Sequence, residues 1–197
     1  HLSESTVCEQ SQITLLEDEI GISAFSGKTV DQRLLVASDV SGILALPDEM
    51  KRCEFTDSHV LPEELVKSDV SRKLFRNDQT VVSDASGRRG HQSESSTCEH
   101  SQKTLLSDET ETSAVSGKTV NKQLLIASDI CGKRALPDEM KQCQLSGSWG
   151  FPEEIVVSEL SEKLFRSDQA VISDVSGRRG HLSESTVCEQ SQITLLE

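Results

Sequence analysis

Apolar and polar residues recur along this chain with a period of fifteen. We number the places of each unit so that Cys8 stands at a third place, and Val36–Met50 is a typical unit. The first, third and fifth places hold an apolar residue, a serine or cysteine, and an apolar residue, and the fourth is mostly acidic. This period of two predicts a short strand with one buried and one wet face, as the frequent Val and Ile also indicate.

Two turn signals divide each unit. Glycine supplies positive φ in a tight turn, and Ser-Gly pairs stand at Ser26-Gly27, Ser41-Gly42, Ser86-Gly87, Ser116-Gly117, Ser146-Gly147 and Ser176-Gly177. After a second short run, Leu46 and Leu136 precede Pro-Asp-Glu, which suits a type I turn. Two turns leave strands of about four or five residues and no room for a helix of ordinary length.

The sequence therefore predicts an all-β, elongated tandem-repeat array, either a β-solenoid or a chain of β-hairpins. Stacked solenoid coils would place the fourth-place acids about 4.8 Å apart, where like charges repel. In a chain of hairpins that spacing is roughly 10 Å and salt screens the repulsion. The charges favour the hairpins, although bound Ca²⁺ would stabilise the solenoid.

Longer periods overlie the unit. Cysteine occupies the third place in one unit of every three, so that the cysteines are 45 residues apart. Residues 1–90 and 91–180 agree at more than half of their positions. Residues 181–197 repeat residues 1–17 without a change. We predict a first repeat over 1–90, a second over 91–180 and the start of a third over 181–197. Duplication inside a longer array explains these copies, and a superhelix with three or six units per turn is the alternative.

Composition excludes several functional classes. A net charge of −13 argues against nucleic acid and against an anionic membrane surface. No apolar run approaches the ~18 residues of a membrane-spanning helix, and no signal peptide is present. With 3% aromatic residues a thick core is not expected, but fixed apolar columns argue against disorder.

The cysteines form a column of their own. They are predicted to be either disulfide partners or a column of small buried thiols, at Cys8, Cys53, Cys98, Cys143 and Cys188. Regular disulfides would indicate an extracellular or cell-surface location. Cys131 shows that the sixth place also accepts cysteine, and the combined pattern C-x-x-C-G-K resembles the knuckle hairpin of a zinc ribbon. No unit has both cysteines, whereas Zn²⁺ needs four N or S ligands, so the resemblance concerns shape more than metal.

Other candidate chemistry is weaker. Thirteen equivalent serines or cysteines indicate structural columns, because catalysis needs one nucleophile with its own base. We therefore predict no catalytic residue, no bound cofactor and no enzyme activity. Ca²⁺ remains an alternative at the acidic pairs of the second turn, which are Asp18-Glu19, Asp48-Glu49, Glu63-Glu64, Asp108-Glu109, Asp138-Glu139 and Glu153-Glu154.

Two functions follow from this interpretation. The first is a structural protein that forms an extended fibre, stalk or filament through stacking and self-association of its β units. The second is a repeat scaffold or adhesin that binds a protein or glycan along its side. Variable places, such as Ser148–Phe151 against Ser58–Leu61 at the eighth to eleventh places, would carry that specificity.

Overall fold

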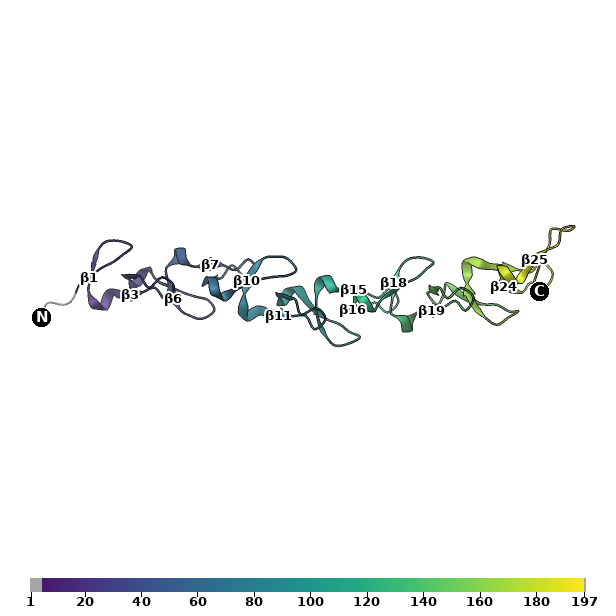
Figure 1. Ribbon diagram of the computed structural model, residues 1–197, viewed down its shortest axis with the longest axis horizontal. Helices are drawn as coiled ribbons and strands as arrows, with labels where there is room; N and C mark the ends of the chain where they lie inside the picture. The colour runs from purple at the N-terminus through teal and green to yellow at the C-terminus, as the bar shows by residue number, and fades with distance from the viewer. Residues whose placement is uncertain (1–4, 197) are drawn as a thin grey trace. The chain divides into compact units, whose positions relative to one another are not determined.

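The structure is a computed structural model that describes residues 5–196. It is all-β, and its strands form thirteen two-stranded antiparallel sheets, each a hairpin of consecutive strands. Figure 1 shows these hairpins as short strands closed by wide loops. The chain is therefore a tandem series of β-hairpins, which confirms the alternative that the fourth-place charges favour.

Each hairpin joins residues around the first and tenth places of one unit. The hairpins are β1(Thr6–Val7)–β2(Thr14–Leu15), β3(Ile20–Ile22)–β4(Thr29–Asp31), β5(Val36–Ala37)–β6(Leu44–Ala45), β7(Lys51–Arg52)–β8(His59–Val60), β9(Leu65–Lys67)–β10(Leu74–Arg76), β11(Thr80–Val82)–β12(Arg89–His91), β13(Ser95–Thr97)–β14(Thr104–Leu106), β15(Thr110–Thr112)–β16(Thr119–Asn121), β17(Ile126–Ala127)–β18(Arg134–Ala135), β19(Lys141–Gln142)–β20(Trp149–Gly150), β21(Ile155–Val157)–β22(Leu164–Arg166), β23(Ala170–Ile172)–β24(Arg179–His181) and β25(Ser185–Val187)–β26(Thr194–Leu196).

Single turns of 3₁₀ helix connect most hairpins to the next. They are η1(Glu17–Glu19), η2(Gln32–Leu34), η3(Pro47–Glu49), η4(Pro62–Glu64), η5(Asn77–Gln79), η6(Gln92–Glu94), η7(Ser107–Glu109), η8(Lys122–Leu124), η9(Pro137–Glu139), η10(Ser167–Gln169) and η11(Leu182–Glu184). Pro47 stands at the start of η3, where its fixed φ suits the first helical position and no intrahelical N–H is needed. The second turn signal thus marks these connections.

The boundaries of the first strand differ from the prediction. The expected strand runs from the first to the fifth place, but in the structure it ends at the second, and the third to eighth places form the hairpin loop. The third-place N–H donates to the eighth-place carbonyl, and the seventh-place N–H turns back to the third-place carbonyl, as in Ser38, Ile43 and Gly42. The fifth place therefore leaves the buried face, and Phe25 is 49% exposed. The alternation of apolar and polar residues in the sequence extends into the hairpin loop, where the backbone is no longer that of a strand.

The loop needs a left-handed residue at its seventh place. All thirteen seventh-place residues have positive φ, and seven of them are glycine. The other six carry side chains in this conformation, at Gln12, Asp57, Arg72, Gln102, Glu162 and Gln192. Left-handed backbone is sterically unfavourable for residues with a Cβ. The Ser-Gly pairs therefore lie where glycine relieves backbone strain.

Changing Arg72 to glycine is expected to stabilise its hairpin by up to about 1 kcal/mol, because the φ of 67° no longer strains a side chain. The reverse change, Gly42→Ala, should destabilise by a similar amount. A Cβ at Gly42 meets no atom within 4 Å, so the loss would be conformational only. Thermal denaturation of both variants checks this; loss of stability in Arg72→Gly would contradict it.

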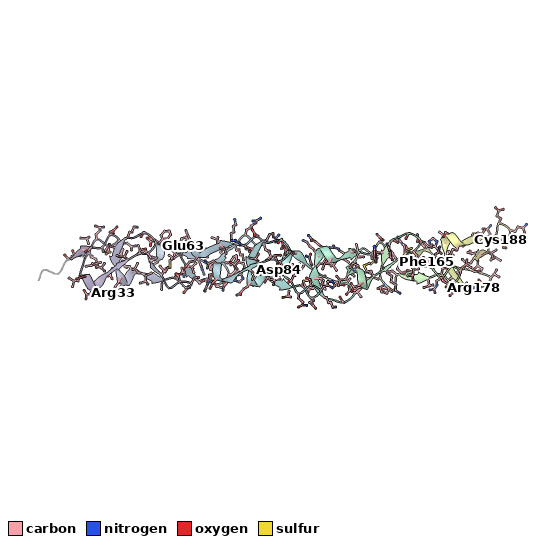
Figure 2. The ribbon with its side chains drawn as sticks, turned by 60° about the horizontal axis from the view of Figure 1, so that its bottom comes forward. Arg33, Glu63, Asp84, Phe165, Arg178 and Cys188 are labelled. Carbon is pink, nitrogen blue, oxygen red and sulfur yellow. The ribbon has the colours of Figure 1, made fainter. Side chains whose placement is uncertain are left out.

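The core is a thin series of clusters along the chain. It is built from third-place Cys and Ser, from tenth-place side chains, and from eleventh-place side chains of the following unit. The tenth and eleventh places complement each other in size: Phe75 packs against His91 with ring centroids 5.4 Å apart. Where the tenth place is Gly90, a Cβ would lie 2.7 Å from Leu106. Phe165, labelled in Figure 2, is fully buried in the same way as Phe75.

The chain divides into two compact parts, each larger than a fifteen-residue unit. One extends to Ser96 and includes Thr104–Ser107, and the other comprises Thr97–Lys103 and Asp108 onward. Each of these two parts is a succession of hairpins of the kind described above. Within residues 5–196 no helix has the length and apolar character needed to cross a membrane.

Candidate functional site

The most regular contacts in this molecule lie at the junctions between consecutive units. At each of twelve junctions the backbone N–H of a fourth-place residue donates to the carbonyl of the ninth-place residue twenty positions later. The N···O distances lie between 2.8 and 3.1 Å, as for Asp39 and His59. These bonds occupy the outer edge of the second strand, which would otherwise present unpaired backbone groups. Each hairpin is thus anchored to the preceding one through its backbone.

The fourth-place side chain completes this contact. Its oxygen accepts the backbone N–H of the same ninth-place residue, at 2.8 Å between Asp39 and His59. The same bond is made by Glu9, Glu54, Asp69, Asp84, Glu99, Asp129, Gln144, Glu159 and Asp174. Only Ala24 and Ala114, among the fourth places of the described junctions, lack an acceptor atom. The acidic fourth place is therefore a structural acceptor and not merely a wet strand position.

Asp39→Ala should weaken its junction by about 1 kcal/mol, because the His59 amide loses its acceptor. Asp39→Asn should keep most of the stability, since the amide oxygen of Gln144 makes the same bond at 2.8 Å. Hydrogen exchange of the His59 amide measures the difference directly. Equal exchange rates in the two variants would show that the side-chain oxygen does not contribute.

A second contact joins the third place of one unit to the fourteenth place of the next. The Ser68 hydroxyl donates to the Glu94 carboxylate at 2.6 Å, and both side chains are buried. Glu94 also accepts the backbone N–H of His91 at 3.0 Å. The same arrangement joins Ser23 to Glu49, Ser38 to Glu64, Ser113 to Glu139, Ser128 to Glu154 and Ser158 to Glu184. Each of these glutamates links two units while satisfying a backbone donor of its own.

Hydrogen bonds keep these carboxylates ionised. The hydroxyls of Ser23 and Ser26 hold the pKa of Glu49 below its usual value. For Glu64, burial raises the pKa, but hydrogen bonds from Ser38 and Ser41 outweigh it and the net direction is downward. A carboxylate that receives several donors is stabilised in its charged form. The serines of the Ser-Gly pairs thus contribute hydroxyls to the junction, in addition to forming the loop.

The structure places the predicted cysteine column at the same third places. Cys8, Cys53, Cys98 and Cys143 are buried, Cys188 is partly buried, and all are free thiols. The Ser11 hydroxyl, with backbone amides nearby, lowers the pKa of Cys8 to about 7. Burial raises the pKa of Cys53, but the Thr56 hydroxyl and surrounding amides reverse this. Third-place sulfur thus accepts hydrogen bonds from its own loop, as third-place serine oxygen does.

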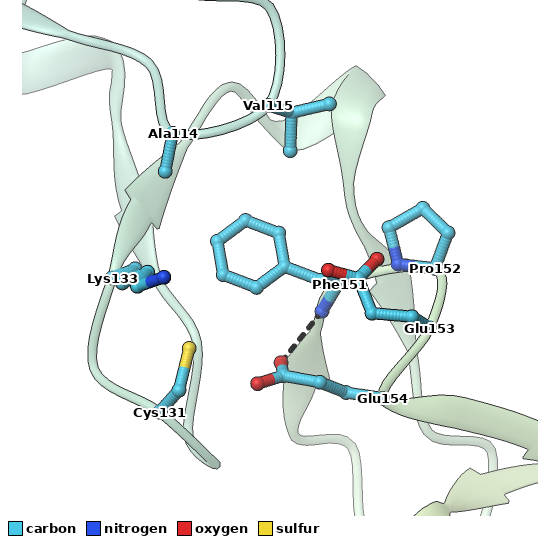
Figure 3. Close-up of a pocket in the computed structure, with 8 residues that line it drawn as sticks. All are labelled: Ala114, Val115, Cys131, Lys133, Phe151, Pro152, Glu153 and Glu154. Carbon is cyan, nitrogen blue, oxygen red and sulfur yellow. Dashed lines mark hydrogen bonds between the residues drawn. The ribbon is translucent and has the colours of Figure 1, made fainter.

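One junction opens into a cavity. A hollow of about 360 Å³ lies beside the Glu154 junction and is lined by Ala114, Val115, Cys131, Lys133, Phe151, Pro152, Glu153 and Glu154. Figure 3 shows Cys131 and Lys133 on one side and Glu154 opposite, bonded to the Phe151 amide at 2.9 Å. Burial raises the pKa of Glu154, but the Cys131 thiol and the Ser128 hydroxyl lower it more. The exposed Cys131 thus takes the role of the sixth-place serine.

The candidate metal positions are distributed over these junctions. The thirteenth-place acids, such as Asp48 and Glu63, are exposed, whereas the adjacent Glu49 and Glu64 point to serine hydroxyls of the preceding unit. Across residues 5–196 no group of three or more His, Cys, Asp or Glu side chains is arranged to hold a metal ion. No family model, no curated protein and no solved structure matches this chain.

Two sets of junction residues were missed in the sequence. The sequence pattern places the fourth-place acids on a wet strand face and presents fourteenth-place glutamates only as part of candidate Ca²⁺ sites. Their signal is present in the sequence, because an acid recurs at the fourth place of most units and a glutamate at the fourteenth place of about two units in three. Fifteen-residue periodicity shows that a column exists, but it does not show which columns meet across a junction.

Proposed function

We propose that this protein is a structural one, in which stacked β-hairpin units build an extended fibre, stalk or filament and further copies associate along its sides. The observation that carries the proposal is the junction itself: within residues 5–196, twelve consecutive junctions repeat one backbone contact. An array of this kind gains stability from nearest-neighbour contacts, so its length can grow without a new core. Such a protein needs no catalytic residues.

Exposed apolar side chains on individual hairpins support self-association. Second-place residues lie on the outward face of the first strand, and several are more than half exposed, at Val7, Ile22, Val82, Val157, Ile172 and Val187. Arg52 and Lys67 occupy the same place in other units and are exposed there. The hairpin therefore tolerates charge at this place, and the apolar residues are not needed for its fold. These side chains supply apolar area that association with another copy would remove from water.

Electron microscopy of the full chain tests the proposal. We expect rods or fibres, and we expect Val82→Lys combined with Ile172→Lys to reduce their lateral association while circular dichroism stays unchanged. Thr112→Lys, at a second place that is already polar, is the matched control. Monomeric particles at all concentrations in the unmodified protein would contradict the proposal.

A scaffold that binds a protein or glycan along its side is the second candidate. Its supporting observation is the cavity beside Glu154, because Phe151 in its lining belongs to the variable stretch Ser148–Phe151. A soluble monomer that retains one partner in a pull-down, and loses it in Phe151→Leu, would favour this function. We propose an extracellular or cell-surface location for either function.

A further inference from the structure

The third and fourteenth places do not vary independently. Wherever the third place is serine, the residue twenty-six positions later is glutamate, in the pairs Ser23–Glu49, Ser38–Glu64, Ser68–Glu94, Ser83–Glu109, Ser113–Glu139, Ser128–Glu154 and Ser158–Glu184. Wherever the third place is cysteine, that residue is leucine or glutamine, in the pairs Cys8–Leu34, Cys53–Gln79, Cys98–Leu124 and Cys143–Gln169. No pair in the sequence mixes the two kinds.

The geometry explains the serine pairs. A fourteenth-place glutamate satisfies its own eleventh-place amide, as Glu94 does for His91, and it is buried against the preceding unit. A buried carboxylate without a strong donor is destabilising. The Ser68 hydroxyl supplies that donor at 2.6 Å. A unit with glutamate at this place therefore requires serine in the unit before it.

The cysteine pairs satisfy their groups in another way. Without a glutamate, the eleventh-place side chain caps its own turn: Asn121 accepts the Gln123 amide at 2.9 Å. At the Cys53 junction, where the fourteenth place is Gln79, the eleventh-place Arg76 binds Asp78 at 2.7 Å. The Gln79 side chain hydrogen-bonds to the His91 ring at 3.2 Å. Burial raises the pKa of the Cys98 thiol, and the Ser101 hydroxyl and nearby backbone amides, including that of Asn121, lower it more. At these junctions the turn is therefore held without a carboxylate at the fourteenth place.

These two solutions explain the longer periods. Serine–glutamate junctions occupy two of every three positions, which produces the spacing of 45 between cysteines. The cysteine junctions alternate between a Leu form, with Asp31 or Asn121, and a Gln form, with Arg76 or Arg166, which doubles that spacing to 90.

We propose that the third-place and fourteenth-place residues form a pairing code that decides which unit can follow which. The recognition surface is the loop face of one unit, its partner is the 3₁₀ turn of the next, and the determining residues are Ser with Glu or Cys with Leu or Gln. Specificity arises because a mismatched pair leaves a buried charge or amide without a partner. This inference concerns order within the chain and goes beyond the proposed assembly of copies.

Two deletions of equal length test the code. Deletion of residues 111–125 joins Cys98 to Glu139, a mismatch, whereas deletion of residues 126–140 joins Ser113 to Glu154, a matched pair. We expect the amide of Leu136 to exchange about tenfold faster in the first deletion than in the intact chain. The amide of Phe151 should retain its protection in the second. Equal protection in the two deletions would overturn the code.

The same substitution should act with opposite sign in two backgrounds. In the 111–125 deletion, Cys98→Ser creates a Ser–Glu pair and should restore protection about tenfold. In the intact chain, Cys98→Ser is paired in the code with Leu124, which offers no carboxylate, and should lower the protection of the Asn121 amide severalfold. The same sign in both backgrounds would overturn the code.

A cycle without deletion covers the case in which the shortened chain does not fold. Leu124→Glu in the full chain places a carboxylate against the Cys98 thiol and should accelerate exchange of the Asn121 amide. Adding Cys98→Ser to it should reverse most of that loss. Strict additivity of the two substitutions would overturn the code. Because each of these measurements reports on one junction within a single chain, its outcome does not depend on whether copies associate into fibres.

Discussion

Replacing Phe75 by alanine is expected to lower the local free energy of unfolding of β9–β10 by about 3 kcal/mol, the largest effect among the substitutions considered. Its ring is fully buried and meets His91 at 5.4 Å and Phe55 at 6.0 Å between centroids. Truncation of a buried aromatic ring removes its transfer free energy and leaves a cavity. The thin core offers few neighbours that can collapse into the space. Native-state hydrogen exchange of the Val66 amide measures the loss.

Phe25 provides the matched control for this substitution. It stands at the fifth place of its unit and is 49% exposed, so Phe25→Ala should change stability by less than about 0.5 kcal/mol. A loss at Phe25 equal to that at Phe75 would mean that the fifth place is buried after all. The comparison therefore tests whether the core lies at the tenth place rather than along the predicted strand.

Ser68→Ala should lower the stability of its junction by about 2 kcal/mol at neutral pH. The substitution removes the hydroxyl that donates to the buried Glu94 carboxylate at 2.6 Å. Ser95→Ala is the control, because its hydroxyl donates only to the carbonyl of Gln92 within its own turn. Chemical denaturation combined with hydrogen exchange of the His91 amide checks both variants.

The loss caused by Ser68→Ala should depend on pH. Burial raises the pKa of Glu94, but the hydroxyls of Ser68 and Ser71 lower it by more than burial raises it. The pKa of Glu94 in the folded protein therefore lies below its value in the unfolded chain. Such a group stabilises the fold above the unfolded pKa of about 4.3, and this contribution disappears as pH falls through the lower folded value. The difference between the two proteins should therefore be complete near pH 6 and shrink below about pH 4. A difference that grows in acid would contradict the role of the ionised carboxylate.

The junctions also give the acidic composition a structural reason. Fourth-place and fourteenth-place carboxylates each accept backbone N–H groups that would otherwise lie unpaired at a hairpin edge or at the start of a 3₁₀ turn. Asp84, labelled in Figure 2, is one of the fourth-place acceptors. Much of the negative charge is thus part of the fold, and it does not by itself indicate a cationic partner.

The amino-acid sequence by itself determined the unit, its two turns and the all-β class. Fifteen-residue spacing, glycine at the seventh place and proline before acidic residues act through local backbone geometry, which needs no distant partner. Only the tertiary structure decided where the strands end, which columns are buried and which side chains meet. Phe25 and Phe75 look alike in the sequence, and their burial differs because one lies in the loop and the other faces the next unit. Likewise, the pairing of Ser68 with Glu94 spans a junction, and its partner is set by how two hairpins pack rather than by the periodicity of either one.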